Sequence, residues 1–414
     1  MNPRRTFLKH GAAVAGAAVS GALATQEARA EANPLGIFPW QTAPGIPAGG
    51  YGQPSPFEKS VQRHLLKPYG DIAPGTGPTF TPLEALEGTI TPSGLHYVRN
   101  HNGTPQIDPA QHRLLIHGRV RRPLVFTVES LLRYPTVSRP HFLECAGNSG
   151  RALTPQPLQI PAGALHGLVS CSEWTGIPLS LLLDEAGVEP GATWLLAEGA
   201  DAAGMSRSIP MEKALDDAMV ALYQNGERLR PEQGYPLRLL LPGWVGNLSV
   251  KWLRRIKVTD APTQTKDETS KYTDPLPDGK ALQFTYEMGV KSVITRPSSG
   301  MTVPGRGVHE ISGLAWSGAG RIARVEVSGD GGASWKATAL EGAQFPKSLV
   351  RFRLPWEWGG APAILQSRAT DEKGNVQPTR KAFVERYAPD ARFHNNSIVS
   401  WAVNADGSVK HVYA

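Results

Sequence analysis

One cysteine inside an apolar stretch is the residue of this 414-residue chain best suited to chemistry. Cys145 lies two residues after the apolar pair Phe142 and Leu143 and precedes Gly147, Asn148 and Gly150. This pattern predicts a buried strand that gives way to a glycine-rich turn, whose residues can adopt positive φ and close backbone approach. The turn would hold the sulfur at the mouth of a pocket lined by backbone amides. A thiolate in such a place can bind a soft metal ion.

A disulfide is the alternative interpretation of the same residue. The chain holds only two cysteines, Cys145 and Cys171, and an exported protein in an oxidising compartment would be expected to pair them. The chain would then be a secreted binding protein of two domains. Without a motif of its own, Cys171 can also be interpreted as a small buried apolar residue. Thiol titration and metal analysis of the purified protein distinguish these hypotheses.

Several motifs, in the same order along the chain, resemble those of the sulfite oxidase family. Residues 145–148, Cys-Ala-Gly-Asn, resemble the segment whose thiolate binds molybdenum together with a molybdopterin dithiolene. The segment Arg99, Asn100 and His101 resembles one that holds the pterin and points an arginine at the substrate. The resemblance extends over about residues 80–414. It implies a molybdenum–molybdopterin cofactor.

The same resemblance assigns further residues to the pterin and its phosphate. In the family, the arginine of Pro-Leu-Arg and the Ser-Val-Lys of Ser-Val-Lys-Trp hold the anionic part of the cofactor, which requires fixed cations and amides. A glutamine stands here where a histidine often precedes Gly-Tyr-Pro-Leu-Arg. An acidic turn after a buried strand is either a pterin contact or a solvated turn. The candidates are Asp201, Gln233, Arg238, Ser249, Val250 and Lys251.

The resemblance also implies which residues meet the substrate. Arg99 can hold two oxygen atoms of a sulfur oxyanion, because a planar guanidinium donates paired, charge-assisted hydrogen bonds. Tyr272, in the charged and surface-lying segment 267–274, is the candidate for an active-site tyrosine, with an exposed linker tyrosine as the alternative. Related enzymes carry an arginine five residues after the cysteine, where this chain has Gly150. Arg151 is the candidate to replace it, and Gly150 would leave a wider mouth for the swinging arm of a carrier protein.

Two other features have two interpretations each. Trp174 lies in a segment that resembles a tryptophan-bearing loop of the family, so it either walls the metal pocket or belongs to the core. Related dimers extend an arginine from the C-terminal tail toward an active site, which makes Arg392 or His394 a candidate. The alternative for the tail is a strand that closes a β-sandwich.

The elements that must position these residues indicate an α+β protein. A mixed molybdopterin domain, of the sulfite oxidase type, is followed by an immunoglobulin-like β-sandwich, which the resemblance assigns to dimerisation. Strands are predicted at 114–118, 123–128, 194–199 and 237–241, and a helix at 181–186 that ends at Gly187. Asp330, Gly331 and Gly332 predict a hairpin turn. The expected divisions are a signal peptide at 1–30, an extended arm at 31–78, the catalytic domain at 79–262, the sandwich at 283–388 and a tail at 389–414.

Residues 1–30 predict export by the twin-arginine route. Arg4 and Arg5 precede an alanine-rich apolar run at 11–24, and residues 28–30 offer small side chains to a signal peptidase. The run has about 14 residues, whereas a membrane span needs roughly 20. Twin-arginine signals export folded proteins, commonly with a cofactor already inserted. We therefore expect a periplasmic protein without a membrane span.

Composition favours short strands and excludes a nucleic-acid partner. Glycine (44) and proline (36) are abundant, and the 40% of hydrophobic residues suffice for two or three domains. The formal net charge is +7, of which residues 1–30 supply +3, which leaves only about +4 for the remainder. Its basic and acidic residues are interspersed, so no basic surface is expected to bind nucleic acid. The arm at 31–78 is either a flexible linker or a segment that wraps a partner.

Within the family, these features most resemble the sulfane dehydrogenases of periplasmic thiosulfate oxidation. They are the export signal, the Gly-Asn-Ser-Gly turn, Gln233, the Lys-Tyr-Thr-Asp segment and a chain without a Cys-x-x-Cys-His haem motif. The resemblance implies a substrate sulfur carried on the cysteine of another protein. Electrons would pass to a c-type cytochrome subunit, because no haem is expected in this chain, and the assembly would be a homodimer or heterotetramer. The alternative is a periplasmic sulfite:cytochrome c oxidoreductase, which the same residues would serve.

Overall fold

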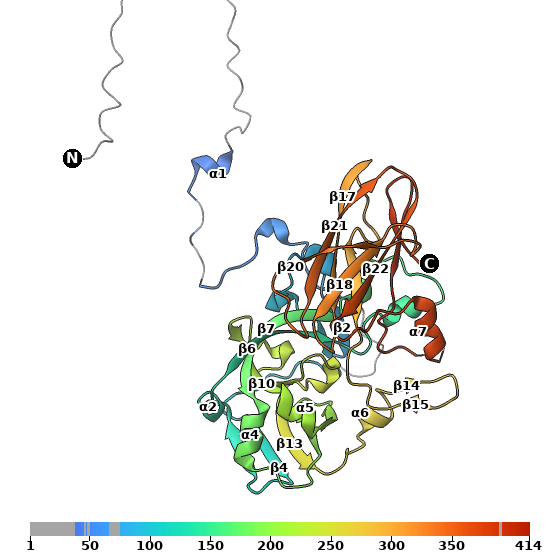
Figure 1. Cartoon of the computed structure of the whole chain (residues 1–414). Coiled ribbons are helices and arrows are strands. Elements are labelled where there is room, and N and C mark those ends of the chain that lie inside the picture. Colours follow the sequence, from blue (N-terminus) through green and yellow to red (C-terminus); the bar gives the residue numbers. More distant parts are fainter. Residues whose placement is uncertain (1–37, 45–46, 48–49, 66–74, 389–390) are drawn as a thin grey trace, which may run out of the picture. The chain divides into compact units, whose positions relative to one another are not determined.

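The computed structural model describes residues 38–44, 47, 50–65, 75–388 and 391–414 (Figure 1). The predicted signal peptide lies outside the described residues, as does part of the predicted arm. The chain forms two compact units, Met1–Pro56 and Phe57–Ala414. The first contains the one-turn helix α1 (Pro39–Thr42). None of the helices in the described ranges has both the length and the apolar character needed to cross a bilayer.

Three sheets form the first half of the larger unit. A small sheet has the order β1-β2-β3, a second has the order β11-β10-β7-β6 with β12 beside β10, and a third has the order β5-β4-β13-β8-β9. In the third sheet β13 is parallel to β4 and antiparallel to β8, so the sheet is mixed. The strands are β1 (His64–Leu65), β2 (Gly77–Phe80), β3 (Val98–Asn100), β4 (Arg113–Gly118), β5 (Leu124–Thr127), β6 (Val137–Glu144), β7 (Val169–Pro178), β8 (Trp194–Gly199), β9 (Ser206–Pro210), β10 (Met219–Gln224), β11 (Glu227–Arg228), β12 (Arg238–Leu240) and β13 (Leu253–Thr259).

Short helices cover these sheets. The predicted amphipathic helix is α4, which buries Leu182 and Leu183 in the core and ends at Gly187, a residue with φ of 72°. Each leucine buried in this way contributes about 2 kcal/mol of hydrophobic stabilisation. The helices are α2 (Val128–Leu131), α3 (Ala162–His166), α4 (Leu179–Ala186), α5 (Met211–Asp216), α6 (Lys266–Thr269) and α7 (Arg380–Arg386). The 3-10 turns are η2 (Pro56–Glu58), η3 (Leu83–Ala85), η4 (Ser93–Leu95), η5 (Gly150–Leu153), η6 (Pro231–Gln233) and η7 (Gly246–Leu248).

The second half is the predicted β-sandwich. One sheet has the order β16-β17-β21-β20 and the other β19-β18-β22-β23-β24, and Phe352 and Trp401 from opposite sheets share one apolar core. The strands are β16 (Lys291–Arg296), β17 (Gly307–Trp316), β18 (Ile322–Ser328), β19 (Lys336–Ala337), β20 (Ala339–Glu341), β21 (Val350–Trp358), β22 (Ala363–Asp371), β23 (Ser400–Val403) and β24 (Val409–Val412). The tail therefore supplies two strands to the sandwich, as one of its two interpretations predicted. The predicted turn joins β18 to β19, with positive φ at Gly331 and Gly332.

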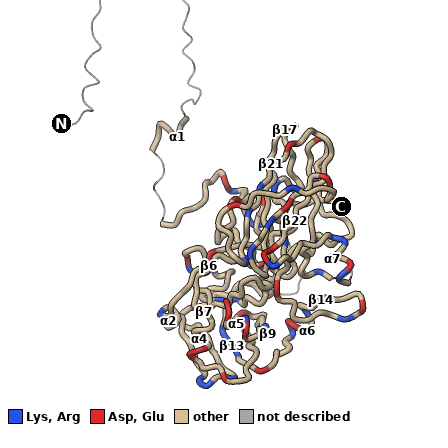
Figure 2. Tube along the Cα trace, viewed as in Figure 1, with Lys and Arg blue, Asp and Glu red and all other residues tan. Residues whose placement is uncertain are grey.

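The connection between the halves is more buried than the sequence indicated. It contains α6 and the short hairpin of β14 (Asp274–Pro275) and β15 (Ala281–Leu282). Basic and acidic residues are interspersed along the chain (Figure 2), but Asp267, Glu268 and Asp274 are all at most 4% exposed. The Glu268 carboxylate is satisfied there, because it accepts hydrogen bonds from the Ser208 hydroxyl and from the backbone amide of Thr265, the residue that caps α6. The prediction of a surface-lying segment was wrong for these carboxylates.

Candidate active site

Cys145 follows β6 directly and begins a tight loop. Its amide donates to the Leu168 carbonyl at 3.0 Å, and its own carbonyl accepts from the Asn148 amide at 2.9 Å. The left-handed residue of this loop is Ser149, with φ of 63°, and not one of the glycines as the sequence suggested. Gly150 is needed for a different reason. A Cβ at that position would lie 2.9 Å from the carbonyl oxygen of Arg392, so the C-terminal segment excludes a side chain there.

Both cysteines are free, so the disulfide interpretation was wrong. Cys171 lies opposite Phe142 in the pairing of β6 with β7. Cys145 is three residues further along, which is about 10 Å at the rise of a strand and well beyond the reach of a disulfide. The Cys171 sulfur is fully buried and contacts the Ser348 hydroxyl at 3.3 Å. It is a small core residue.

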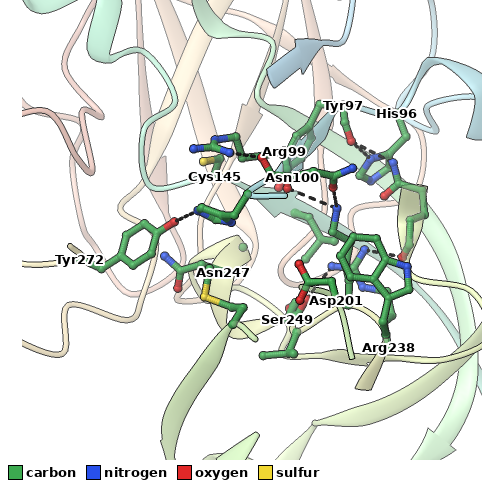
Figure 3. Close-up of a pocket in the computed structure, with 18 residues that line it drawn as sticks. His96, Tyr97, Arg99, Asn100, Cys145, Asp201, Arg238, Asn247, Ser249 and Tyr272 are labelled. Carbon is green, nitrogen blue, oxygen red and sulfur yellow. Dashed lines mark hydrogen bonds between the residues drawn. The ribbon is translucent and has the colours of Figure 1, made fainter. Parts of the chain in front are cut away.

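A cavity opens beside Cys145 (Figure 3). Widely separated segments line it, from β3 to the connection after α6. Eleven of the twelve candidate site residues meet there. They are Arg99, Asn100, His101, Cys145, Asp201, Gln233, Arg238, Ser249, Val250, Lys251 and Tyr272.

Two buried cations dominate the electrostatics of one side of the cavity. Arg238 donates to the carbonyls of Gln233 at 3.1 Å and Ser249 at 2.8 Å, and burial lowers its pKa to about 10. Lys251 Nζ donates to the Asn100 side chain and to the Glu232 carbonyl at 3.0 Å. Burial, followed by the nearby charge of Arg238, lowers the pKa of Lys251 to about 7. An anion bound here would relieve the cost of holding both charges.

On the other side of the cavity lies a neutral pair. The Tyr272 hydroxyl is 3.0 Å from Nε2 of His101 (Figure 3). Burial lowers the pKa of His101 to about 3 and raises the pKa of Tyr272 well above its usual value. The imidazole is therefore neutral and the phenol protonated at physiological pH. The two groups share one hydrogen bond, whose donor depends on the tautomer of the ring, and this bond fixes the direction of Tyr272.

Two opposing effects act on the pKa of the Cys145 thiol. Burial raises its pKa above the usual value, whereas the Arg99 guanidinium favours the thiolate and partly offsets this effect. Binding of a metal would remove the proton outright. The raised pKa thus favours the protonated thiol in the absence of metal, and metal binding converts it to the thiolate ligand.

Arg151 does not reach the cavity. The chain turns away from Cys145 after the left-handed residue Ser149, and η5 directs Arg151 to the carbonyl of Ala164, 3.2 Å from its Nη1. The structure therefore does not bring Arg151 to the position expected of a substrate-facing cation. Trp174 is core: its side chain is fully buried and donates to a carbonyl of β6 at 3.1 Å.

The C-terminal segment touches the Cys145 loop without directing its arginine there. The amide of His394 donates to the Ala146 carbonyl at 2.8 Å, and Phe393 packs against the Tyr272 ring. The His394 imidazole lies 3.7 Å from the buried carboxylate of Asp274, outside the cavity lining. The Arg392 side chain is exposed in this chain.

Sequence reasoning missed seven lining residues and one buried cation behind them. The seven are His96, Tyr97, Leu143, Met205, Gly246, Asn247 and Trp252. All except Met205 lie within three residues of a predicted site residue, and this nearness in the sequence was a usable signal. Arg207 had no such signal in β9. Its guanidinium is almost fully buried, donates to the Asn247 side chain and lies 5.2 Å from the Tyr272 ring centroid.

The lining fits a molybdenum–pterin cofactor. Three buried polar atoms at the cavity have no partner: His96 Nε2, Asp201 Oδ1 and Asn247 Nδ2. Such atoms suit a ring system rich in donors and acceptors, and the cations of Arg238 and Lys251 suit its phosphate. Within the described ranges, histidine, cysteine and carboxylate side chains form no group of three or more that could hold a metal ion. A metal bound to Cys145 must therefore bring its other ligands with it, as a dithiolene does.

Comparisons with known proteins agree with this fit. Residues 101–266 match the oxidoreductase molybdopterin binding domain, and residues 282–399 match the Mo-co oxidoreductase dimerisation domain. The crystal structure of the sulfane dehydrogenase SoxCD from Paracoccus pantotrophus superposes with a TM-score of 0.89. It is 46% identical and covers 92% of this chain and 98% of that chain. The chain belongs to the sulfite oxidase family of molybdenum enzymes. The α+β domain followed by a dimerisation sandwich is confirmed, and the secreted binding protein is excluded.

Curated relatives with lower sequence identity also match. NADH nitrate reductases of Solanum lycopersicum and Arabidopsis thaliana are each 34% identical over 345 residues, which is 72% of this chain. The chain spans only 37% of the length of these relatives. The chain is a molybdenum-dependent oxidoreductase, as the Cys145 segment predicted.

Proposed function

We propose that this chain is the molybdenum subunit of a sulfane dehydrogenase, which oxidises sulfane sulfur carried on a cysteine of another protein. One observation carries the proposal. A thiol and the cations Arg99, Arg238 and Lys251 line one cavity. The sequence around them is 46% identical to that of sulfane dehydrogenase SoxCD, in a match that covers 92% of this chain. Residues 79–262 form the catalytic domain, and residues 283–388 form the dimerisation domain together with the two strands of the tail.

The residues of the cavity divide into holding and orienting groups. Cys145 supplies a thiolate ligand, and Arg238, Ser249 and Lys251 hold the phosphate end of the cofactor. This assignment is supported by the hydrogen bonds that anchor both cations to backbone carbonyls at the cavity. Asn100, Asp201, Gln233 and Val250 meet the pterin. When bound, the molybdenum cofactor transfers an oxygen atom and accepts two electrons, which is the hard part of the chemistry.

Substrate orientation falls to Arg99 and Tyr272. The guanidinium presents fixed donors to oxygen atoms on the sulfur. With the ring proton of the neutral His101 on Nε2, the imidazole donates to the Tyr272 oxygen, and the single O–H of the phenol is left to donate to the substrate. Because the Tyr272 pKa is raised, the phenol keeps its proton across the physiological range. Apolar lining from Leu143 and Met205 limits the water that reaches the sulfur.

Gly150 and Arg151 favour a carrier-bound sulfur over a small free dianion. Neither residue places a cation at the cavity. Gly150 has no room for a side chain, and the Arg151 guanidinium donates to the Ala164 carbonyl outside the cavity lining. The mouth thus has no cation from residue 150 or 151, and the backbone of the C-terminal segment fills the space next to Gly150. Such a mouth suits a sulfur that arrives on the end of another protein's flexible segment.

The remaining parts of the proposal concern place and partners. Residues 1–30 direct the folded protein to the periplasm by the twin-arginine route. The two cysteines are 26 residues apart and cannot form a Cys-x-x-Cys-His motif, so a c-type haem has to come from a cytochrome subunit. The match to a dimerisation domain supports a homodimer or heterotetramer built on the sandwich.

Steady-state kinetics of the purified protein test the proposal. The substrates are a sulfane sulfur carried on a protein cysteine and free sulfite, with a c-type cytochrome as acceptor and the Cys145→Ser variant as the inactive control. We expect a higher kcat/KM for the carried sulfur and about one molybdenum per chain. A clear preference for free sulfite would replace this assignment by that of a sulfite dehydrogenase. A protein without molybdenum would refute both.

A further inference from the structure

A buried polar network surrounds the loop that begins at Cys145, and its residues lie outside the cavity lining. It joins Glu144 at the end of β6, Ser149 in the loop, Lys291 at the start of β16 and Asn395 in the C-terminal segment. These four side chains are at most 3% exposed. None of the four lines the cavity. The network therefore connects the Cys145 loop to the β-sandwich and to the C-terminal segment.

Lys291 is the centre of this network. Its ammonium group donates to Ser149 Oγ at 2.6 Å, to the Asn395 carbonyl at 2.7 Å and to Glu144 Oε1 at 3.2 Å. A lysine has three N–H donors, and here each one has a partner. Two of the three partners flank Cys145 at a distance of one and four residues. The Lys291 side chain, which belongs to the sandwich, thus donates hydrogen bonds to residues on both sides of Cys145.

The partners of Lys291 are themselves fixed. Glu144 Oε1 also accepts from the Asn148 side chain at 2.8 Å, and Glu144 Oε2 accepts from Trp316 Nε1 at 2.7 Å. Asn148 in turn accepts from the Leu168 amide at 3.0 Å. Every polar residue from Glu144 to Ser149 therefore has a buried partner outside the loop or across it.

Ser149 needs this support because its backbone is left-handed, with φ of 63°. That conformation costs a non-glycine residue energy and persists only where the surroundings hold it. Its carbonyl accepts from the Asn395 side chain at 2.9 Å, and its hydroxyl is 2.6 Å from His166 Nδ1 as well as from Lys291. The strained residue is thus held at two separate atoms.

Stability alone does not account for a buried ion pair. Apolar residues of similar volume are often as stabilising or more so, because desolvation offsets the attraction between the two charges. A fully satisfied polar network instead specifies one geometry. The geometry specified here is that of a loop whose sulfur faces the cavity.

We propose that Lys291 is a positioning residue, through which the β-sandwich holds the Cys145 loop in the conformation that binds the metal. The inference rests on the proposed role of Cys145 as the metal ligand. Lys291 acts through Glu144 and Ser149 and does not touch the cofactor. The dimerisation domain accordingly contributes a residue that positions the metal-binding loop of the active site.

Lys291→Met tests this inference, because methionine keeps the length of the side chain and removes its donors. Hydrogen exchange of the holoenzyme is followed at the amides of residues 145–150. The thiolate-to-molybdenum charge-transfer absorption is recorded in the same samples. We expect loop exchange to be at least about tenfold faster, the absorption band to shift and kcat to fall with little change in KM. The matched control is Lys213→Met, since Lys213 is also a buried, ion-paired lysine but contacts Asp217 and Pro242.

A second variant separates positioning from a merely structural role. Lys291→Met leaves Glu144 as an unpaired buried carboxylate, so the melting temperature will fall. Glu144→Gln combined with Lys291→Met removes that charge, and we expect the melting temperature to recover while the fast loop exchange and the shifted band remain. Recovery of all three together would overturn the inference. If the unaltered protein shows no band because it binds no metal, the proposed function fails, and loop exchange alone still decides whether Lys291 holds the loop.

Discussion

Lys251→Met should weaken cofactor binding in a way that depends on pH. Lys251 Nζ lies at the cavity, anchored to the Glu232 carbonyl at 3.0 Å, and methionine retains its length without its charge. In the cofactor-free protein the pKa of Lys251 is lowered to about 7, first by burial and then by Arg238. A phosphate bound beside the ammonium group would raise that pKa again. Binding and protonation of Lys251 are therefore coupled.

The size of the effect follows from two contributions. A charge-assisted hydrogen bond contributes about 1.5 to 3 kcal/mol, which is roughly a 10-fold to 150-fold loss of affinity in the variant below pH 7. Above pH 7 the unaltered protein must take up a proton to bind, at a cost of about 1.4 kcal/mol for each pH unit. Its affinity should then fall about tenfold per unit, so that the advantage over Lys251→Met is nearly gone at about pH 9.

Anaerobic titration of cofactor-free protein with isolated cofactor, at pH 6, 7, 8 and 9, measures this dependence. The intrinsic fluorescence of Trp252, which lies under the Lys251 ammonium group, can report binding. Lys213→Met is the control, because burial lowers the pKa of Lys213 to about 8 although the residue lies outside the cavity lining. Equal affinities of variant and unaltered protein at pH 6 would refute the reasoning. So would an unaltered protein whose affinity stays constant from pH 6 to 9.

Four further substitutions have definite expected outcomes. Cys145→Ser should reduce the molybdenum content to near zero by elemental analysis, whereas Cys171→Ser should leave it unchanged, because that sulfur is buried away from the cavity. Tyr272→Phe should lower kcat about a hundredfold in steady-state assays, since it removes the hydroxyl that contacts His101; a normal kcat would exclude the phenol from the reaction. Arg207→Met should destabilise the protein by about 3 to 5 kcal/mol in thermal denaturation, because it leaves Glu268 buried without its ion pair, and Arg207→Lys should recover part of that loss. Arg151→Met should change kcat/KM by less than about twofold, and a larger fall would restore Arg151 as a substrate-facing cation.

Residues of the site that lie in short linear motifs were predictable from the sequence. Cys145, Arg238 and Lys251 each follow or open an apolar run, and their chemistry distinguishes them from the strands around them. Such residues occur at strand ends, where the backbone delivers them to a common edge. The sandwich was predictable for a similar local reason, because turn residues such as Asp330 and Gly331 mark the ends of its strands.

Residues whose role depends on distant partners were not predictable. Lys291 opens an apolar strand and reads as a charge at its edge, but its carboxylate partner Glu144 lies 147 residues earlier. Arg207 similarly looks like a solvent-facing residue of β9 until Glu268 and Tyr272 are placed against it. The direction of Arg151 depends on the left-handed backbone of Ser149, which the glycines on either side concealed.

The contacts of residues 394 and 395 with the loop after Cys145 also set an order of events in the making of this protein. The cysteine leaves the ribosome about 250 residues before the segment that caps its loop through Ala146 and Ser149. A nascent chain can fold its early sheets, but the contacts around the Cys145 loop are complete only once translation has passed residue 395. Loading of the cofactor into the completed site is thus a post-translational step. A chain truncated before this segment would contain every residue that lines the cavity. It would still lack the hydrogen bonds that residues 394 and 395 make to the loop of Cys145.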